Sequence, residues 1–162
     1  MRWFKKARVF SLVKYKPAME TNNNFTGSIE LFFRKYENVY NRQQFKEQAT
    51  MFAKFLVAAG PQGAACHKNN FFTRMLYAWG LRKWYKKTGL ESMKIIAMEQ
   101  KPISNDYCLI KIHWGAMFEK TMEKLIQFDV SYVVRITGKM EIVMYIAHED
   151  ERKSLKALGI ID

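Results

Sequence analysis

Ile142-Val-Met-Tyr-Ile-Ala-His-Glu-Asp-Glu151 is the stretch that decides the fold, because it closes a strand-rich region that begins near residue 107. Across residues 107–151, apolar and polar side chains alternate with the two-residue period of a strand, and no helical period appears. Helical patterns occupy much of the chain before it. Helices followed by long strands indicate an α+β fold, in which a bent antiparallel sheet packs on three N-terminal helices.

The net charge of the 162-residue chain is +12, and it is unevenly distributed. Residues 1–19 hold six basic residues and no acidic one, which accounts for half of the excess. We therefore predict a basic N-terminal tail over residues 1–24 and a single domain over residues 25–162. We favour an unstructured extension over contact of residues 1–16 with a membrane surface. The sequence leaves open whether translation starts at Met1 or Met19.

Three helices are expected before the long strands. The first spans about residues 28–41 and carries a broad apolar stripe, and the second spans about residues 44–54. The third follows Asn69 or Asn70 as its N-cap and ends at Gly89 as a left-handed C-cap. Its periodicity predicts an inner stripe of Phe72, Met75, Leu76 and Trp79, with basic side chains in water.

The strands begin with a hairpin, residues 55–59 and 64–68, joined by a glycine- and proline-containing turn. Four longer strands are expected at residues 93–100, 107–119, 125–137 and 140–148, and a short C-terminal helix at residues 151–158. Strand parity places Tyr132 with Phe128 and Val130 on one face. It also places His148 on the same face as Ile142 and Ile146, and His113 on the outer face.

Several function classes find no support in the sequence. Cys66 and Cys108 each lie in an apolar run, which favours two buried thiols in a reducing compartment and hence a cytoplasmic location. No metal-ligand spacing, phosphate-binding glycine loop or dinucleotide fingerprint is present, so we expect no metal and no cofactor. The basic run 82–87 suits a solvated helix end better than a nucleic-acid interface.

Two segments resemble a known superfamily. The order of elements, the hairpin at residues 55–69 and the last strand at residues 142–150 are similar to the cone-shaped fold of nuclear-transport-factor-2-like proteins. Ketosteroid isomerase and the SnoaL-like polyketide cyclases belong to this superfamily, and the resemblance is to a branch without an assigned activity. It covers about residues 26–158. It implies a pocket between the helices and the concave sheet face, and a homodimer through the convex face, near Val133 and Val143.

Five residues are candidates for the pocket. Tyr36 and Tyr40 lie on the inner stripe of the first helix, where ketosteroid isomerase has an oxyanion donor, but ordinary core aromatics would share this pattern. Trp114 and Tyr132 could line the pocket or belong to the core. His148 is the candidate general base or ligand donor, with a hydrogen-bonded strand end as the alternative. No acidic residue lies where many relatives place an aspartate, which argues against isomerase chemistry.

Three functions follow from these patterns. The first is a dimeric pocket protein that binds a small hydrophobic or aromatic molecule through Tyr36, Tyr40, Trp114, Tyr132 and His148. The second is an isomerase, cyclase or dehydratase that uses His148 as its base. The third is a basic interaction module that contacts an acidic partner.

Overall fold

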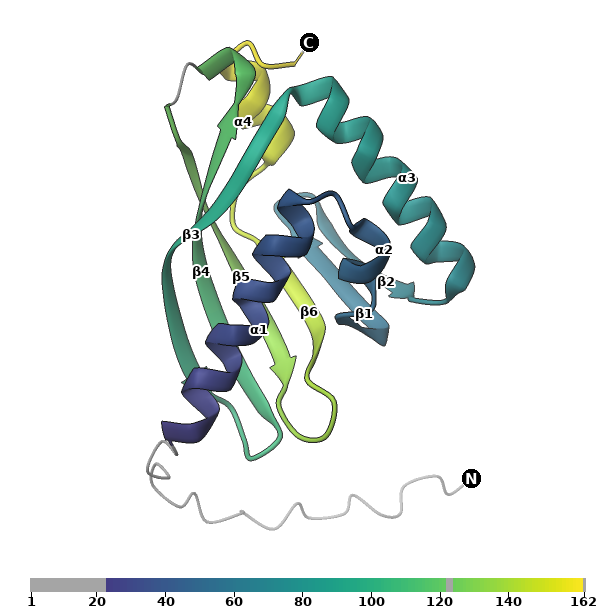
Figure 1. The fold of residues 1–162 in the computed structure, drawn as a ribbon, viewed down its shortest axis with the longest axis vertical. Coiled ribbons are helices and arrows are strands. Elements are labelled where there is room, and N and C mark those ends of the chain that lie inside the picture. The colour runs from purple at the N-terminus through teal and green to yellow at the C-terminus, as the bar shows by residue number, and fades with distance from the viewer. Residues whose placement is uncertain (1–22, 122–123, 162) are drawn as a thin grey trace, which may run out of the picture.

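A six-stranded curved sheet organises the protein, for which a computed structural model describes residues 23–121 and 124–161 (Figure 1). The strand order is β2-β1-β6-β5-β4-β3, and every neighbouring pair is antiparallel except the parallel pair β1 and β6. The strands are β1 (Phe52–Gly60), β2 (Gly63–Lys68), β3 (Leu90–Pro102), β4 (Tyr107–Phe118), β5 (Ile126–Arg135) and β6 (Glu141–Ala147).

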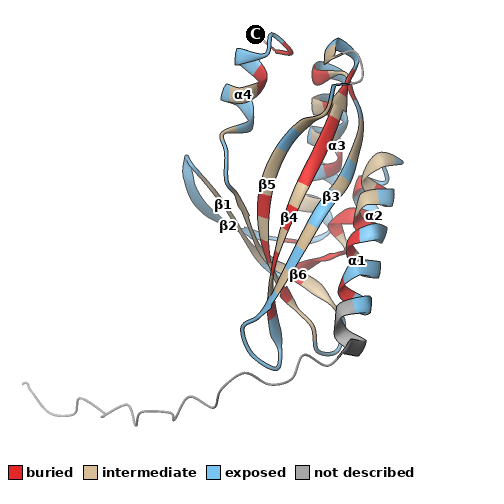
Figure 2. Ribbon diagram, turned by 90° about the vertical axis from the view of Figure 1, so that its left-hand side faces the viewer, coloured by how far each residue is buried: buried red, intermediate tan, exposed pale blue. Residues whose placement is uncertain are grey.

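Four α-helices accompany the sheet, so the predicted α+β class is confirmed. They are α1 (Asn23–Asn41), α2 (Phe45–Ala49), α3 (Phe71–Thr88) and α4 (Glu151–Ala157), with one short 3₁₀ turn, η1 (Glu119–Thr121). Figure 2 shows α1 and α2 on one side of β3 and β4, which is the concave side of the sheet, and α3 passing behind the strands. The predicted second helix is shorter than expected, because β1 already begins at Phe52.

The inner stripe of α1 forms the centre of the core, as its periodicity predicts. Ile29, Phe33, Tyr36 and Val39 are all buried against the inward side chains of β4 and β5. The C-terminal end of α1 is held on β3, because the Asn41 side chain bonds both the N–H and the C=O of Met93, at 2.8 and 2.7 Å.

The stripe of α3 that its sequence predicts to be buried is exposed in the structure. Phe72, Met75, Leu76 and Trp79 are exposed, and the helix instead turns Ala78 and Tyr85 inward. The predicted caps are present: Asn70 forms a capping box with Thr73, and Gly89 takes the left-handed conformation at φ 64°. The pattern therefore located the helix correctly and its buried face wrongly.

Local irregularities curve the sheet. The pairing of β3 with β4 shifts twice, between Leu90 and Ser92 and between Ile95 and Ala97. The sequence predicts the bend at Gly115, on the partner strand. A Cβ at Gly115 would lie 2.9 Å from the Ile96 side chain, so the glycine permits close packing at the bend.

Two predictions concern the ends and the thiols of the chain. Residues 1–22, most of the predicted tail, lie outside the described residues, whereas Asn23 and Asn24 belong to α1. Cys108 is buried as expected, but Cys66 is exposed on β2, so the prediction of two buried thiols is wrong for Cys66. Among the described residues, no helix combines the length and the apolarity needed to cross a bilayer.

Candidate functional site

A cavity of about 240 Å³ opens between the concave sheet face, α1, α3 and the segment leading into α4. Most of its wall is apolar and comes from residues distant in the sequence. The apolar side chains are Phe52, Leu81, Leu90, Met93, Ala116, Phe118, Ile126, Phe128, Val130, Ala147 and Leu155. The polar part of this wall comes from five tyrosines, Tyr36, Tyr40, Tyr77, Tyr132 and Tyr145, and from Gln127, Asp129, Glu149, Glu151 and Ser154. Such a wall favours a small molecule with a large apolar surface and few polar groups.

The predicted residues Tyr36 and Tyr132 contact each other in this wall. Both side chains are buried, and their ring centroids lie 6.2 Å apart. Burial raises the pKa of Tyr36 and of Tyr132 above the ordinary tyrosine value. Both hydroxyls therefore remain protonated at neutral pH and can donate hydrogen bonds.

Trp114 supports this pair from behind. Its indole is fully buried, outside the cavity lining, and its Nε1 donates to the Tyr132 hydroxyl at 3.2 Å. Because an indole N–H can only donate, the Tyr132 oxygen accepts this bond and keeps its own hydrogen for another partner. Trp114 thus orients Tyr132 instead of forming the wall for which it is a candidate.

Gln48 of α2 adds an amide beside the tyrosines. Its side chain is completely buried, and its Oε1 accepts a hydrogen bond from the Tyr77 hydroxyl at 3.2 Å. The amide lies near the Tyr36 hydroxyl, but its Nε2 has no partner with hydrogen-bond geometry among the described residues. A buried N–H without an acceptor is costly, and this one lies beside the tyrosines but outside the cavity lining.

The mouth of the cavity carries acidic groups that sequence reasoning missed. Glu149 and Glu151 both line it, and Glu151 Oε1 accepts a hydrogen bond from Trp84 Nε1 of α3 at 3.3 Å. Although part of Glu151 is exposed, the partial burial of its carboxyl raises the pKa of Glu151 above the ordinary value. Burial, then the neighbouring Tyr85, and then the charge of Glu151 raise the pKa of Tyr40, which lines the cavity as predicted.

His148 does not face the cavity, contrary to the parity argument. The register of β6 shifts between Ile142 and Met144, so the inward residues change from Ile142 to Tyr145 and Ala147. His148 is consequently exposed, and its Nε2 lies 2.8 Å from Ser131 Oγ. This matches the alternative of a hydrogen-bonded strand end, and no inward position remains for His148 as a base.

A second polar cluster lies on the convex face. His113 Nδ1 is 2.8 Å from Asp129 Oδ1, Lys111 Nζ is 3.0 Å from Asp129 Oδ2, and His113 Nε2 is 3.0 Å from Gln127 Oε1. His113 is on the outer side, as its parity predicts. Across residues 23–121 and 124–161, no group of three or more histidine, cysteine or acidic side chains could hold a metal ion.

A second cavity of about 260 Å³ adjoins the first. It lies between the β1–β2 hairpin and the start of α3, and it shares Phe52, Tyr77 and Tyr145 with the first cavity. These three aromatic side chains therefore form a partition between the two. Tyr77 and Tyr145 were absent from the sequence candidates, because the helix was assigned its other face and the strand contains an unpredicted bulge.

Comparison with known proteins identifies the fold. No family model and no curated protein sequence matches the chain. Among solved structures, an NTF-2-like protein of unknown function from Shewanella oneidensis is 16% identical with a TM-score of 0.58, covering 76% of this chain and 98% of that one. A protein from Catenulispora acidiphila in complex with S-DNPA is 10% identical with a TM-score of 0.59, covering 82% and 98%.

A ketosteroid isomerase-like protein from Erwinia carotovora atroseptica is 17% identical with a TM-score of 0.50, covering 78% of this chain and 96% of its own. At these identities the likeness concerns the fold, and it agrees with the strand order and the helix-covered concave face described above. The chain therefore has the cone-shaped fold of nuclear-transport-factor-2-like proteins.

Proposed function

We propose that this protein binds a small apolar or aromatic molecule that carries a hydrogen-bond acceptor, such as a carbonyl oxygen. The observation that carries the proposal is the pairing of an apolar wall with buried, protonated tyrosine hydroxyls at one end. The wall supplies affinity, and the polar end sets the orientation of the ligand.

The buried hydrogen-bond donors favour a ligand that carries an acceptor. Trp114 occupies the Tyr132 oxygen as an acceptor, and Gln48 presents an amide nitrogen without a partner close to Tyr36. A ligand oxygen that reaches Tyr36 and Tyr132 would accept hydrogen bonds from their hydroxyl groups. A ligand without an acceptor would leave these buried donors unsatisfied, which lowers its affinity.

The test uses 1-tetralone, a two-ring ketone, and tetralin, the hydrocarbon without its oxygen. We expect tetralone to bind more tightly in ligand-observed NMR titrations. The variant Tyr36→Phe removes the hydroxyl and keeps the ring, and it should weaken only tetralone, by about 0.5–1.5 kcal/mol. Tyr107→Phe, on an exposed strand end, is the matched control. Equal affinity of both compounds for the wild-type protein would contradict the proposal.

We further propose a homodimer through the convex face. Leu109, Val133, Met144 and Val57 pair directly across β4, β5, β6 and β1, so these half-buried side chains form one apolar row. The sequence argument named Val133 and Val143 for this surface, and Met144 joins Val133 in the row. Val133→Asp should convert a dimer to a monomer in sedimentation velocity, whereas Lys101→Glu, in exposed β3, should not.

A second candidate function uses Glu151 in place of His148. Its position at the cavity mouth and its raised pKa suit a carboxylate that accepts a proton from a bound substrate. Deuterium exchange at the carbon beside the tetralone carbonyl would detect this, and Glu151→Gln should abolish the exchange without preventing binding. We also propose a cytoplasmic location, because the exposed thiol of Cys66 would remain reduced there.

A further inference from the structure

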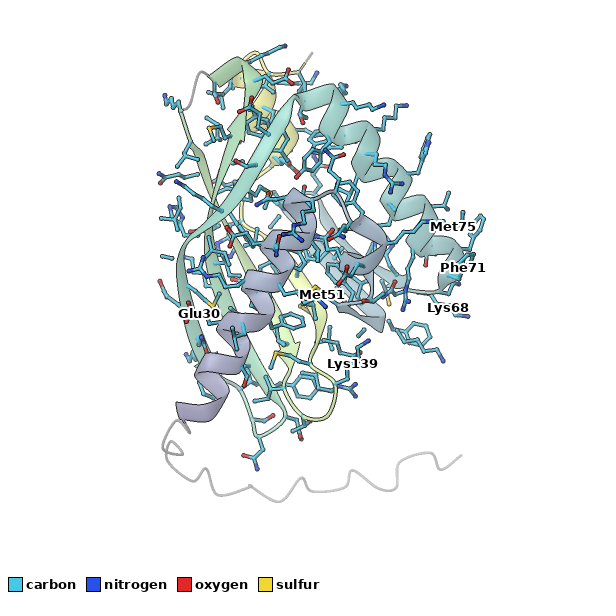
Figure 3. The ribbon with its side chains drawn as sticks, in the orientation of Figure 1. Glu30, Met51, Lys68, Phe71, Met75 and Lys139 are labelled. Atoms are coloured by element: carbon cyan, nitrogen blue, oxygen red, sulfur yellow. The ribbon has the colours of Figure 1, made fainter. Side chains whose placement is uncertain are left out.

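The outer face of α3 is the most apolar exposed surface among the described residues. Of the twelve exposed large hydrophobic side chains, five lie on this face of α3. Phe71, Phe72 and Trp79 are 79%, 66% and 64% exposed, and Met75 and Leu76 lie between them. We call these five residues the α3 patch. Figure 3 shows Phe71 and Met75 at the outer edge of the molecule, beside Lys68.

The fold does not require this patch. The opposite side of α3 supplies Ala78 and Tyr85 to the core and Tyr77 and Leu81 to the cavity wall. The helix is also capped at both ends by local contacts, so it forms without cover on its outer face. Exposed apolar side chains concentrated on one helix indicate an interaction surface.

Cations surround the α3 patch, and no acidic residue occurs within the helix. Lys54 and Lys68 lie at its N-terminal end, where Lys54 Nζ is 5.8 Å from the Phe55 ring centroid. On the C-terminal side, Lys83 Nζ is 5.6 Å from the Trp79 ring centroid. Arg82, Lys86 and Lys87 extend the positive charge along the exposed helix.

We propose that α3 docks on an anionic lipid surface, with the α3 patch inserted among the acyl chains and the surrounding cations at the headgroups. Aromatic and aliphatic side chains beside lysine and arginine are the combination that binds this interface. A single projecting helix suits a fluid surface, because lipids conform to it and no shaped partner groove is required. Nucleic-acid phosphates would pair with the cations but would leave Met75 and Leu76 in water.

This docking goes beyond the proposed ligand binding and does not depend on it. It does place the cavity close to the lipid surface, because α3 carries the patch on its outer face and cavity residues on its inner face. An apolar ligand that dissolves in the bilayer could therefore enter with little exposure to water.

The test is flotation of the full chain with vesicles. Vesicles of phosphatidylcholine and phosphatidylglycerol should carry the protein upward, and vesicles of phosphatidylcholine alone should carry much less. Raising the salt from about 0.1 M to about 1 M shortens the Debye length from roughly 10 Å to roughly 3 Å and should reduce binding. The double variant Phe72→Ser/Trp79→Ser should lower the partition coefficient by about tenfold or more, and Lys83→Glu/Lys86→Glu should act similarly on anionic vesicles.

Matched controls separate the patch from other surfaces. Leu31→Ser changes an exposed leucine of α1, and Lys101→Glu changes an exposed lysine of β3; neither should alter flotation. Thermal melting should show that all variants remain folded. The proposal is overturned if the wild type does not float, if the α3 variants float like the wild type, or if they change the sedimentation coefficient. The last result would identify the patch as a contact between copies.

Discussion

Helices α1 and α3 both carry large apolar side chains, but only α1 buries the stripe that its sequence predicts. The apolar side chains of α1 gather on one face, whereas α3 has apolar or aromatic side chains on both of its faces. The stripe of α1 enters the core, with Phe33 fully buried, whereas the stripe of α3 faces outward, with Phe72 66% exposed. Periodicity therefore identifies a helix and its apolar face, but the neighbouring elements decide whether that face is covered.

Phe33 gives the strongest test of the difference in burial between the stripes of α1 and α3. Phe33→Ala removes a completely buried ring that packs on Tyr132 at 5.0 Å between centroids. We expect a loss of about 3–5 kcal/mol in the free energy of unfolding, a large part of the stability of a domain of this size. Urea denaturation measures it. A loss below about 1 kcal/mol would mean that α1 is not packed as described.

The cap of α3 should have an intermediate effect. Asn70→Ala removes the side-chain acceptor of the Thr73 N–H, a bond of 3.0 Å. Loss of an N-cap costs about 1 kcal/mol, and it should matter here because few core contacts hold the first turn. Urea denaturation gives the energy, and hydrogen exchange should show faster opening of the first turn of α3. Asn70→Asp, which can still accept the bond, is the control.

The contribution of Glu151 to stability, at the contact between α3 and the cavity mouth, should depend on pH. The pKa of Glu151 is raised in the folded state, so its contribution to stability is complete below the unfolded pKa and is lost as the pH rises through the folded pKa. Glu151→Gln should remove this loss. The melting temperature of the variant relative to the wild type should therefore be higher at pH 7 than at pH 4. An unchanged difference would show that the carboxyl is solvated like an ordinary surface group.

The smallest effect is expected on the outer face of α3. Phe72→Ala should change the free energy of unfolding by no more than about 0.5 kcal/mol, because the side chain is exposed. Replacement of phenylalanine by alanine should strongly destabilise the protein at Phe33, but it should hardly change the stability at Phe72. A loss above about 1.5 kcal/mol in urea would contradict the exposure of the stripe and remove the basis for lipid docking.

Much of the fold could be predicted from the sequence. Turn residues and caps are local signals, so the β1–β2 hairpin, Asn70 and Gly89 were identified correctly. Strand alternation also placed Tyr132 inward and His113 outward. These signals act over a few residues and need no knowledge of distant partners.

The candidate site was predicted less completely. Tyr36, Tyr40 and Tyr132 line the cavity, because an unbroken helical or strand period carries them inward. His148 lies outside because one bulge in β6 reverses the parity of every residue after it, and Tyr145 lines the wall for the same reason. No composition signal marks such a bulge, since it depends on pairing with β5 and β1.

By itself, the sequence determined the helices, the strands, their order and the excess of positive charge, since each depends on local pattern or composition. Only the tertiary structure decided which helix face is buried, where the parity of β6 changes, and that Glu151 joins the tyrosines around one cavity, with Gln48 bonded to Tyr77. Those outcomes depend on contacts between residues far apart in the chain, and a periodic pattern holds no information about what will lie against it.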